Sequence, residues 1–213
     1  MLLNAPDLTP RNLRRAGFWP LMTPGSVALL DLTDPAVMRA GLAQKWRNRL
    51  NRAEAQGLRL RHSRLQGHHW LLKAETTQAR LRGYRGLPPA LCLSIARTSP
   101  GTAHIWEVTG PGGPLAGVLM LRHGRMATWQ IGHVTPEGRK SCAINLALWA
   151  AIVWLAEAGH ACLDLGLLNS DDAPGLAHFK LGTGARVQGL GGTWLHYGAL
   201  APFARRLPGR LAA

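Results

Sequence analysis

The sequence predicts an α/β domain of the α+β kind, with a mixed, mostly antiparallel sheet, a crossover helix and flanking helices. Apolar residues at spacings of three and four mark an amphipathic helix between Pro35 and Gly57. Three short strand-like runs separated by tight turns lie between His104 and His133, as in an antiparallel meander. A long apolar stretch, Cys142 to Ala158, is followed at once by another strand-like run, which is typical of a helical crossover.

The first half of the chain begins with residues 1–25, where four prolines predict an irregular arm. An apolar run from Ser26 to Leu32 predicts a strand. The helix that follows has Thr33 or Asp34 as its cap, a proline at its first position and a glycine after its end. Alternation of apolar and basic residues predicts a further strand at residues 58–62. Two weaker patterns predict helices at residues 65–83 and 88–97.

The second half contains the meander, with expected strands at residues 104–109, 115–123 and 126–133. Thr135 and Pro136 predict the start of one long helix that Gly159 ends. The strand Ala161 to Leu165 is then reached by a helical crossover, so we expect it to run parallel to the third meander strand. A short helix after Asp171 or Asp172 and one glycine-interrupted strand over residues 185–197 complete the pattern.

The net charge of +14 is concentrated in the first part of the chain. Residues 1–85 carry 15 Lys or Arg and 5 acidic residues, whereas residues 86–213 carry 10 and 6. A field of this size attracts RNA, phosphorylated small molecules or an anionic membrane surface. Solvated arginines of a GC-rich genome are the alternative explanation.

Three cysteines in apolar runs show no metal-ligand spacing, so we expect neither a metal site nor disulfides. The N-terminus lacks the pattern of a signal peptide, and Cys142 to Ala158 is interpreted as a core helix rather than a membrane span. We therefore expect a cytoplasmic protein, with peripheral attachment to the inner face of the membrane as a possibility left open by the charge.

Four places in the second half have residues suited to chemistry. The predicted helix start carries Gly138, Arg139 and Lys140, which could bind phosphate, although an ordinary capped helix would look the same. Asp164, at the end of a strand, could orient an amine or accept its proton, or could simply cap the loop that follows. Lys180 could neutralise a phosphate or a developing oxyanion. His133 could act as an acid–base group.

A basic set on the first long helix is a candidate surface for nucleic acid or another anion, and comprises Arg47, Arg49 and Arg52. The sequence contains no Ser-His-Asp arrangement, P-loop, HExxH or dinucleotide fingerprint. It also lacks a nucleic-acid recognition motif, so charge alone points to RNA.

Several segments, in order, resemble the FemAB-like branch of the GNAT acyltransferase superfamily over roughly residues 26–196. They are the arginine-rich Trp46-Arg-Asn-Arg-Leu-Asn-Arg-Ala-Glu-Ala-Gln-Gly57, Pro114-Leu-Ala-Gly-Val118, Asn145-Leu-Ala-Leu-Trp149, Leu163-Asp-Leu-Gly166 and Phe179-Lys180 with Gly184-Ala185. The resemblance implies a GNAT-like sheet whose two central strands splay apart to admit an activated acyl donor. FemAB-like members use aminoacyl-tRNA, and other relatives use acyl-CoA.

The resemblance implies that an amine attacks an activated ester or thioester carbonyl, with the protein supplying position, an oxyanion donor and a proton acceptor. We expect an acyltransferase that forms an amide, with either aminoacyl-tRNA or acyl-CoA as donor substrate and no permanently bound cofactor. An acetyl-CoA-dependent N-acetyltransferase is one alternative. However, Arg139-Lys-Ser-Cys-Ala-Ile144 lacks the small residues of the usual R/Q-x-x-G-x-G/A motif.

A second alternative, of another class, is a non-catalytic module that binds RNA or an anionic membrane on a degenerate GNAT core. The acceptor amine and the oligomeric state are not specified by the sequence. In domain terms, we expect an arm over 1–25 and one GNAT-like domain over 26–200. The domain would consist of a basic part (26–100) and a core (101–200), and a tail would cover 201–213.

Overall fold

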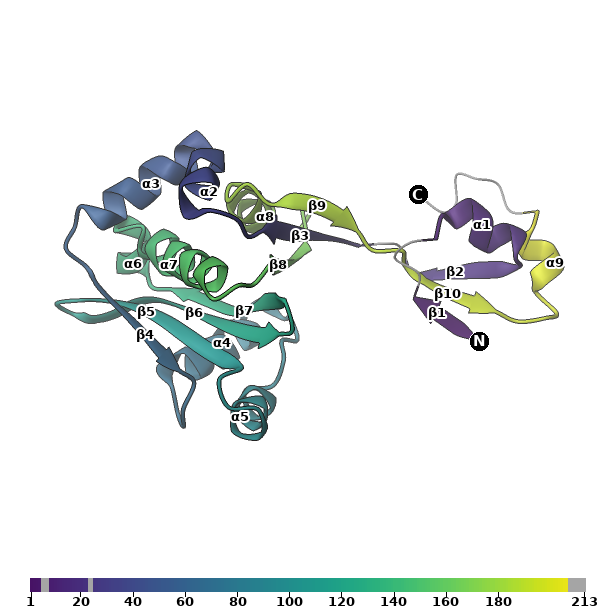
Figure 1. Ribbon diagram of the computed structural model, residues 1–213. Helices are drawn as coiled ribbons and strands as arrows, with labels where there is room; N and C mark the ends of the chain where they lie inside the picture. Colours follow the sequence, from purple (N-terminus) through teal and green to yellow (C-terminus); the bar gives the residue numbers. More distant parts are fainter. Residues whose placement is uncertain (5–7, 23–24, 207–213) are drawn as a thin grey trace. The chain divides into compact units, whose positions relative to one another are not determined.

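The computed structural model describes residues 1–4, 8–22 and 25–206 (Figure 1). The chain divides into two compact units. The larger unit consists of Leu29–Gly166 and His178–Arg186, and the smaller unit of Met1–Ala28, Leu167–Ala177 and Val187–Ala213. The structure thus has two units where the sequence predicted one domain over 26–200, because segments distant in sequence pair to form the smaller one.

A seven-stranded mixed sheet has the order β4-β5-β6-β7-β8-β3-β9 (Figure 1). Its strands are β3 (Ser26–Asp31), β4 (Arg59–Arg64), β5 (Ala103–Gly110), β6 (Gly113–His123), β7 (Met126–Val134), β8 (Cys162–Leu168) and β9 (Arg186–Gly189). Strands β4 to β7 are antiparallel neighbours, and β7 pairs with β8 in parallel. The predicted meander, the helical crossover and the mixed, mostly antiparallel sheet are confirmed.

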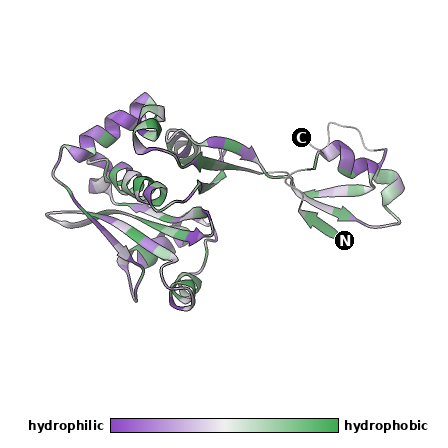
Figure 2. Ribbon diagram, in the orientation of Figure 1, coloured by the Kyte–Doolittle hydropathy of each residue, from purple (hydrophilic) through white to green (hydrophobic). Residues whose placement is uncertain are grey.

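Helices cover both faces of this sheet, as the alternation along β5 requires. Trp106 points to the face of α7 (Ala143–Glu157), where its ring packs against Trp154. Ile105 points to the other face and shares a core with Leu71 of α4 (Trp70–Arg82) and Cys92 of α5 (Pro89–Thr98). Helix α7 is predominantly apolar in Figure 2, and most of its buried side chains are aliphatic, as expected of a core helix.

The predicted helix between Pro35 and Gly57 is in fact two helices, α2 (Pro35–Gly41) and α3 (Gln44–Glu54). The expected cap is confirmed, because the Asp34 carboxylate accepts hydrogen bonds from two backbone N–H groups of the first turn. The break occurs at Leu42, whose backbone is extended. There the Arg47 guanidinium donates to the carbonyl oxygens of Ala40 and Leu42, which satisfies the end of α2.

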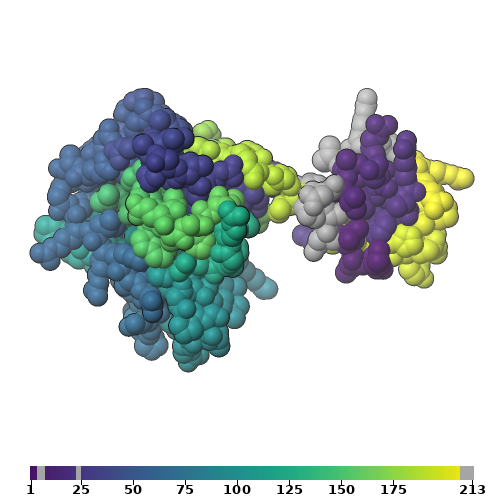
Figure 3. All heavy atoms as spheres, viewed as in Figure 1, coloured from purple at the N-terminus to yellow at the C-terminus, as the bar shows by residue number. Residues whose placement is uncertain are grey.

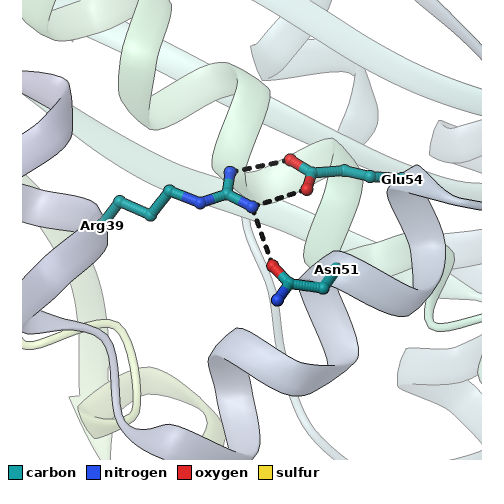
Figure 4. A network of polar contacts seen from close by, with 3 residues as sticks. All are labelled: Arg39, Asn51 and Glu54. Atoms are coloured by element: carbon teal, nitrogen blue, oxygen red, sulfur yellow. Dashed lines mark hydrogen bonds and ion pairs between the residues drawn. The ribbon is translucent and has the colours of Figure 1, made fainter.

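A second arginine ties the two helices together (Figure 4). Arg39 of α2 donates to both carboxylate oxygens of Glu54 and to the side-chain oxygen of Asn51, both on α3, at 2.6 to 2.8 Å. The guanidinium holds the pKa of the Glu54 carboxyl below its usual range. This arginine is therefore already neutralised and helps to fix the orientation of α3.

The long helix predicted after Thr135 is also two helices, α6 (Pro136–Lys140) and α7. The Ser141 hydroxyl donates to the carbonyl oxygens of Glu137 and Gly138, and so competes with helical hydrogen bonds. Cys142 then adopts a left-handed backbone conformation with φ of 57°. The chain consequently starts α7 afresh, with no side-chain cap.

The predicted final strand over 185–197 is split between two sheets, as β9 and β10 (Thr193–His196). Gly192, with φ of +73°, lies between them in a conformation that other residues rarely adopt. The predicted short helix is α8 (Pro174–Leu181).

The smaller unit is built around a three-stranded antiparallel sheet of order β1-β10-β2. Its elements are β1 (Leu2–Asn4), α1 (Pro10–Arg15), β2 (Phe18–Met22), β10 and α9 (Ala201–Ala204). Leu13, Phe18 and Trp194 form its core. Residues 1–25 are thus not an irregular arm in their described part: Pro10 occupies the first turn of α1, and β10 supplies a partner for β1 and β2 from far along the chain.

The expected C-terminal tail contains α9, and residues 207–213 of that tail lie outside the described residues. Within the described ranges, none of the helices combines the length and the apolar character needed to cross a membrane.

Candidate functional site

The two central strands of the sheet separate part of the way along. Strands β7 and β8 are paired at three positions, from Met126↔Cys162 to Thr128↔Asp164. Both strands continue beyond this pairing, β7 to Val134 and β8 to Leu168. The result is the opening between parallel strands that the family resemblance implies, and the candidate residues lie on its two sides.

On the β8 side, Lys180 and Asp164 are close together. The side chain of Lys180, on α8, is only 7 % exposed, and its Nζ lies 3.5 Å from the position that a Cβ on Gly166 would occupy. Burial lowers the pKa of Lys180, while the negative charge of Asp164 raises it in part. A positive charge is thus held at the end of β8 with little access to water.

Asp164 is also used locally, because its carboxylate accepts a hydrogen bond from the backbone N–H of Gly166 at 2.7 Å. This local contact lies within β8, where Gly166 has a φ of 83°, and not in a loop after the strand as the alternative interpretation of Asp164 expected. Asp164 therefore stabilises the turn that brings Gly166 under Lys180, in addition to facing the ammonium.

Aromatic side chains support the same place. The ring of Phe179 lies between Trp46 of α3 and Trp129 of β7, with centroids 5.8 and 6.0 Å away. A β-bulge at this level of β7 shifts the register with β6, and the Trp129 indole donates to the carbonyl oxygen of Ile131. The residue before Lys180 is thus anchored to both α3 and the central strand.

On the β7 side, the structure gives Gly138 a packing role. The Thr135 hydroxyl accepts the N–H of Gly138 at 3.0 Å, so this amide is not available to a phosphate. A Cβ at Gly138 would overlap the backbone carbonyl of Leu115 on β6. Glycine is required here because the chain after β7 crosses β6 at close range.

Arg139 and Lys140, in contrast, reach an open groove of about 560 Å³ on the surface of the larger unit. The facing wall comes from α3, which Figure 2 shows as largely hydrophilic and which lies at the surface of this unit in Figure 3. The groove has five cationic side chains and no acidic one among its lining residues, which are Lys45, Asn48, Arg49, Arg52, Arg139, Lys140 and Cys142. We refer to it as the basic groove.

The basic groove unites two sets of residues that the sequence predicted separately. Arg49 and Arg52 of the anion-binding set face Arg139 and Lys140 of the donor-binding set. Arg47 is not in the groove, because its guanidinium caps the end of α2. Lys45 was missed by the sequence interpretation, although its spacing of four and seven from Arg49 and Arg52 places the three on one helical face.

His133 lies near the end of β7 and lines a second hollow. Burial lowers the pKa of His133 first, and the positive charges of Arg139 and Arg82 lower it further. Arg139 belongs to the basic groove, whereas Arg82 lines a pocket of about 480 Å³ between α4 and His133. Nothing in the sequence connected α4 with His133, since their proximity depends on the packing of α4 on β7.

The candidate catalytic residues are thus arranged as two groups. Asp164 and Lys180 are together on the β8 side, and His133 lies with Arg139 on the β7 side. The part of the chain that the structure describes contains no cluster of three or more His, Cys, Asp or Glu suited to a metal ion. The arrangement combines a buried cation, a histidine with a depressed pKa and an open basic groove around one gap in the sheet.

The sequence matches the family described as Acetyltransferase (GNAT) domain over residues 40–181. No curated protein matches the chain. The matched range contains α3, the meander, the crossover and Lys180, so it covers every candidate residue of the site.

Solved structures share the fold at low sequence identity. FemX superposes with a TM-score of 0.67 at 14 % identity, over 86 % of this chain and 67 % of its own. The C-terminal domain of a protein named as a lysylphosphatidylglycerol synthetase of Agrobacterium fabrum gives 0.59 at 17 %, over 89 % and 64 %. L-PGS of Bacillus licheniformis gives 0.57 at 13 %, over 94 % and 69 %. The chain thus spans about two thirds of the length of each.

Proposed function

Because the chain belongs to the family of GNAT acetyltransferase domains, a transferase family, we propose that it transfers an aminoacyl group from aminoacyl-tRNA to an amine, forming an amide. The observation that carries this proposal is the basic groove. Five cations without a neighbouring carboxylate in its lining form a surface that needs a polyanionic partner. A tRNA end presents a line of phosphates to such a surface, and its ester-linked aminoacyl group could extend to the gap between β7 and β8.

The groove favours an RNA donor over acyl-CoA. A pyrophosphate is usually held by a tight, glycine-rich loop at a helix start. Here that segment has Cys142 and Ile144 where the small residues would be, and Gly138 is packed against Leu115. The cations of the groove are instead spread over two helices. One structure that shares the fold is named as a lysylphosphatidylglycerol synthetase, a name that agrees with an aminoacyl group as cargo.

The two sides of the gap have complementary roles in this proposal. The amine nitrogen attacks the ester carbonyl carbon, a C–N bond forms, and the C–O bond to the tRNA ribose breaks. Lys180 stabilises the negative charge that develops on the carbonyl oxygen, an effect that is strong where water is excluded. His133 accepts the proton from the amine and returns it to the departing ribose oxygen.

The test is binding of three probes to the full chain: an aminoacyl-tRNA, the same tRNA uncharged, and acetyl-CoA. We expect the double substitution Arg49→Ala/Arg52→Ala to weaken tRNA binding about 10- to 100-fold and to reduce the salt dependence by about two units of slope. Arg80→Ala/Arg97→Ala is the matched control, because it removes equal charge from exposed positions outside the groove.

Three outcomes would contradict the proposal. Equal losses in both double variants would show that net charge alone attracts RNA. Groove-dependent binding of acetyl-CoA without binding of tRNA would identify an acetyl-CoA-dependent N-acetyltransferase. Equal affinity for charged and uncharged tRNA, with no transfer to any amine, would favour the non-catalytic module.

A further inference from the structure

One wall of the pocket between α4 and β7 is formed by Trp70, which packs on a row of residues across the sheet. Glu107, Gly117 and His133 are aligned across β5, β6 and β7 in the sheet register. The indole of Trp70 lies over Gly117, where a Cβ would come within 3.1 Å of its Cζ2. Because Gly117 has no side chain, the middle of the row has space for the Trp70 indole.

Trp70 is fixed in this position at both ends. Its indole N–H donates to the Glu107 carboxylate, and its ring meets the His133 ring edge-on at a centroid distance of 5.9 Å. The same carboxylate lies 3.5 Å from the His69 side chain. Glu107 is thus occupied by the supporting wall, and it does not appear among the lining residues of the pocket.

The charged residues that line the pocket are both cationic. Lys73 and Arg82 come from the exposed face of α4, and none of the described residues that line the pocket carries a carboxylate. Apolar surface is supplied by Trp70 and by Leu81, which is 82 % exposed. An exposed leucine beside two cations forms a surface suited to a ligand with an anionic group on a short carbon chain.

His133 is the lining residue that connects this pocket to the reaction. Its Nδ1 is buried and has no hydrogen-bond partner among the described residues. Arg82, which lines the pocket, and Arg139, which lines the basic groove, both lower its pKa. Arg139 of α6 and Arg82 of α4 are the charged groups that act on its pKa, and Trp70 and Lys73 of α4 line the pocket beside it.

We propose that this pocket is the acceptor subsite and that its substrate is a primary amine carrying a separate anionic group, a carboxylate or a phosphate. Lys73 and Arg82 bind the anionic group, and the amine lies against His133. This assignment rests on the proposed aminoacyl transfer for the reaction itself, but the subsite can be tested without the donor. Trp70 is a positioning residue, since Glu107 holds it and it in turn holds the imidazole.

The experiment is calorimetric titration of the full chain with two matched pairs of amines. O-phosphoethanolamine is compared with ethanolamine, and glycylglycine with glycylglycine amide. We expect each anionic amine to bind at least tenfold more tightly than its neutral counterpart, and the tighter of the two anionic amines identifies phosphate or carboxylate as the preferred group. Equal affinities within both pairs, or no binding by any probe, would overturn the assignment.

Arg82→Met and Arg80→Met form the matched pair of variants. Both remove one exposed arginine from α4, but Arg80 does not line this pocket. Arg82→Met should weaken binding of the anionic amine about tenfold, and Arg80→Met should leave it unchanged. Equal weakening in both would show that the general field of the protein, not the pocket, attracts the ligand.

The donor provides the means to separate this inference from the proposed function. Arg82→Met should leave aminoacyl-tRNA binding as in the unaltered chain. If the anionic amines bind in the pocket and no charged tRNA binds, the donor assignment is wrong and the subsite stands. If charged tRNA binds in the basic groove and the amines show no preference for an anionic group, the subsite is wrong and the donor assignment stands.

Discussion

The two sides of the gap in the sheet differ in whether their cationic side chains are buried or exposed. On the β8 side, Lys180 is buried, faces Asp164 and is supported by an aromatic cluster. On the β7 side, the cations of the basic groove are spread around an open hollow without an acidic partner in its lining. A buried charge must be compensated from within the protein, whereas an exposed set of like charges is available to a ligand. The comparison separates a buried lysine beside β8 from an open set of like charges on the β7 side.

Substitution of the buried lysine should have the largest effect on transfer. Lys180→Met should reduce the rate of acyl transfer about 100- to 1,000-fold, because it removes the charge that stabilises the developing oxyanion. Single-turnover kinetics with charged tRNA would measure this. Stability should change little, since removing a desolvated charge offsets the loss of its attraction to Asp164. A large loss of stability with an unchanged transfer rate would show that Lys180 is only structural.

The histidine on the other side should show its role through pH. His133→Asn should lower transfer about 100-fold near pH 7. The pKa of His133 is depressed by burial and by Arg139 and Arg82, so the neutral, proton-accepting form persists below pH 6.5 and activity should fall only at lower pH. Arg82→Met removes one of the charges that lower this pKa, so the pH at which activity falls should move up toward 6.5. A limb that is unchanged in both variants would exclude His133 as the proton acceptor.

The glycine at the end of β7 distinguishes packing from binding. Gly138→Ala should lower the free energy of unfolding by about 1–3 kcal/mol, because the added methyl group would overlap the Leu115 carbonyl. Urea denaturation measures the change. Normal stability combined with weaker donor binding would instead restore Gly138 to the phosphate-binding role that the sequence suggested.

Two arginines on α3 provide the finest comparison. Arg47→Ala should cost about 1–2 kcal/mol of stability, since it removes the two hydrogen bonds that satisfy the end of α2, and should leave tRNA affinity unchanged. Arg49→Ala should weaken tRNA binding and leave stability unchanged. Thermal unfolding and tRNA binding on both variants would decide it, and an equal effect on affinity would place Arg47 back in the anion-binding surface.

Local sequence signals predicted the elements well where the signal is itself local. Asp34 caps α2 and Thr135 caps α6, each before a proline in the first turn. The helix breaks were missed because they depend on contacts that periodicity does not contain. One break requires Arg47 to reach back to Leu42, and the other requires the Ser141 hydroxyl to take helical carbonyl groups.

Long-range pairing was the other limit on prediction from sequence. Strand β1 pairs with β10 through contacts such as Leu2↔Leu195, so the first residues form a strand only because β10, far along the chain, pairs with them. The residue types of the candidate site were visible in the sequence: Lys180 and Asp164 lie close together, Arg139 lines the basic groove, and their roles stay predictions. The pocket at His133 was not, because Trp70, Lys73 and Arg82 reach it only through the packing of α4 on β7.

In the proposed reaction, an aminoacyl group is transferred from tRNA held in the basic groove to an amine at His133. Its most direct test is transfer of a radiolabelled aminoacyl group from tRNA to O-phosphoethanolamine, followed by chromatography of the amide. We expect a labelled amide that requires both Lys180 and the Arg49/Arg52 pair and is retained in the Arg80→Met control. Labelled product formed equally well by the Lys180→Met and Arg49→Ala/Arg52→Ala variants, or no product with any anionic amine, would contradict it.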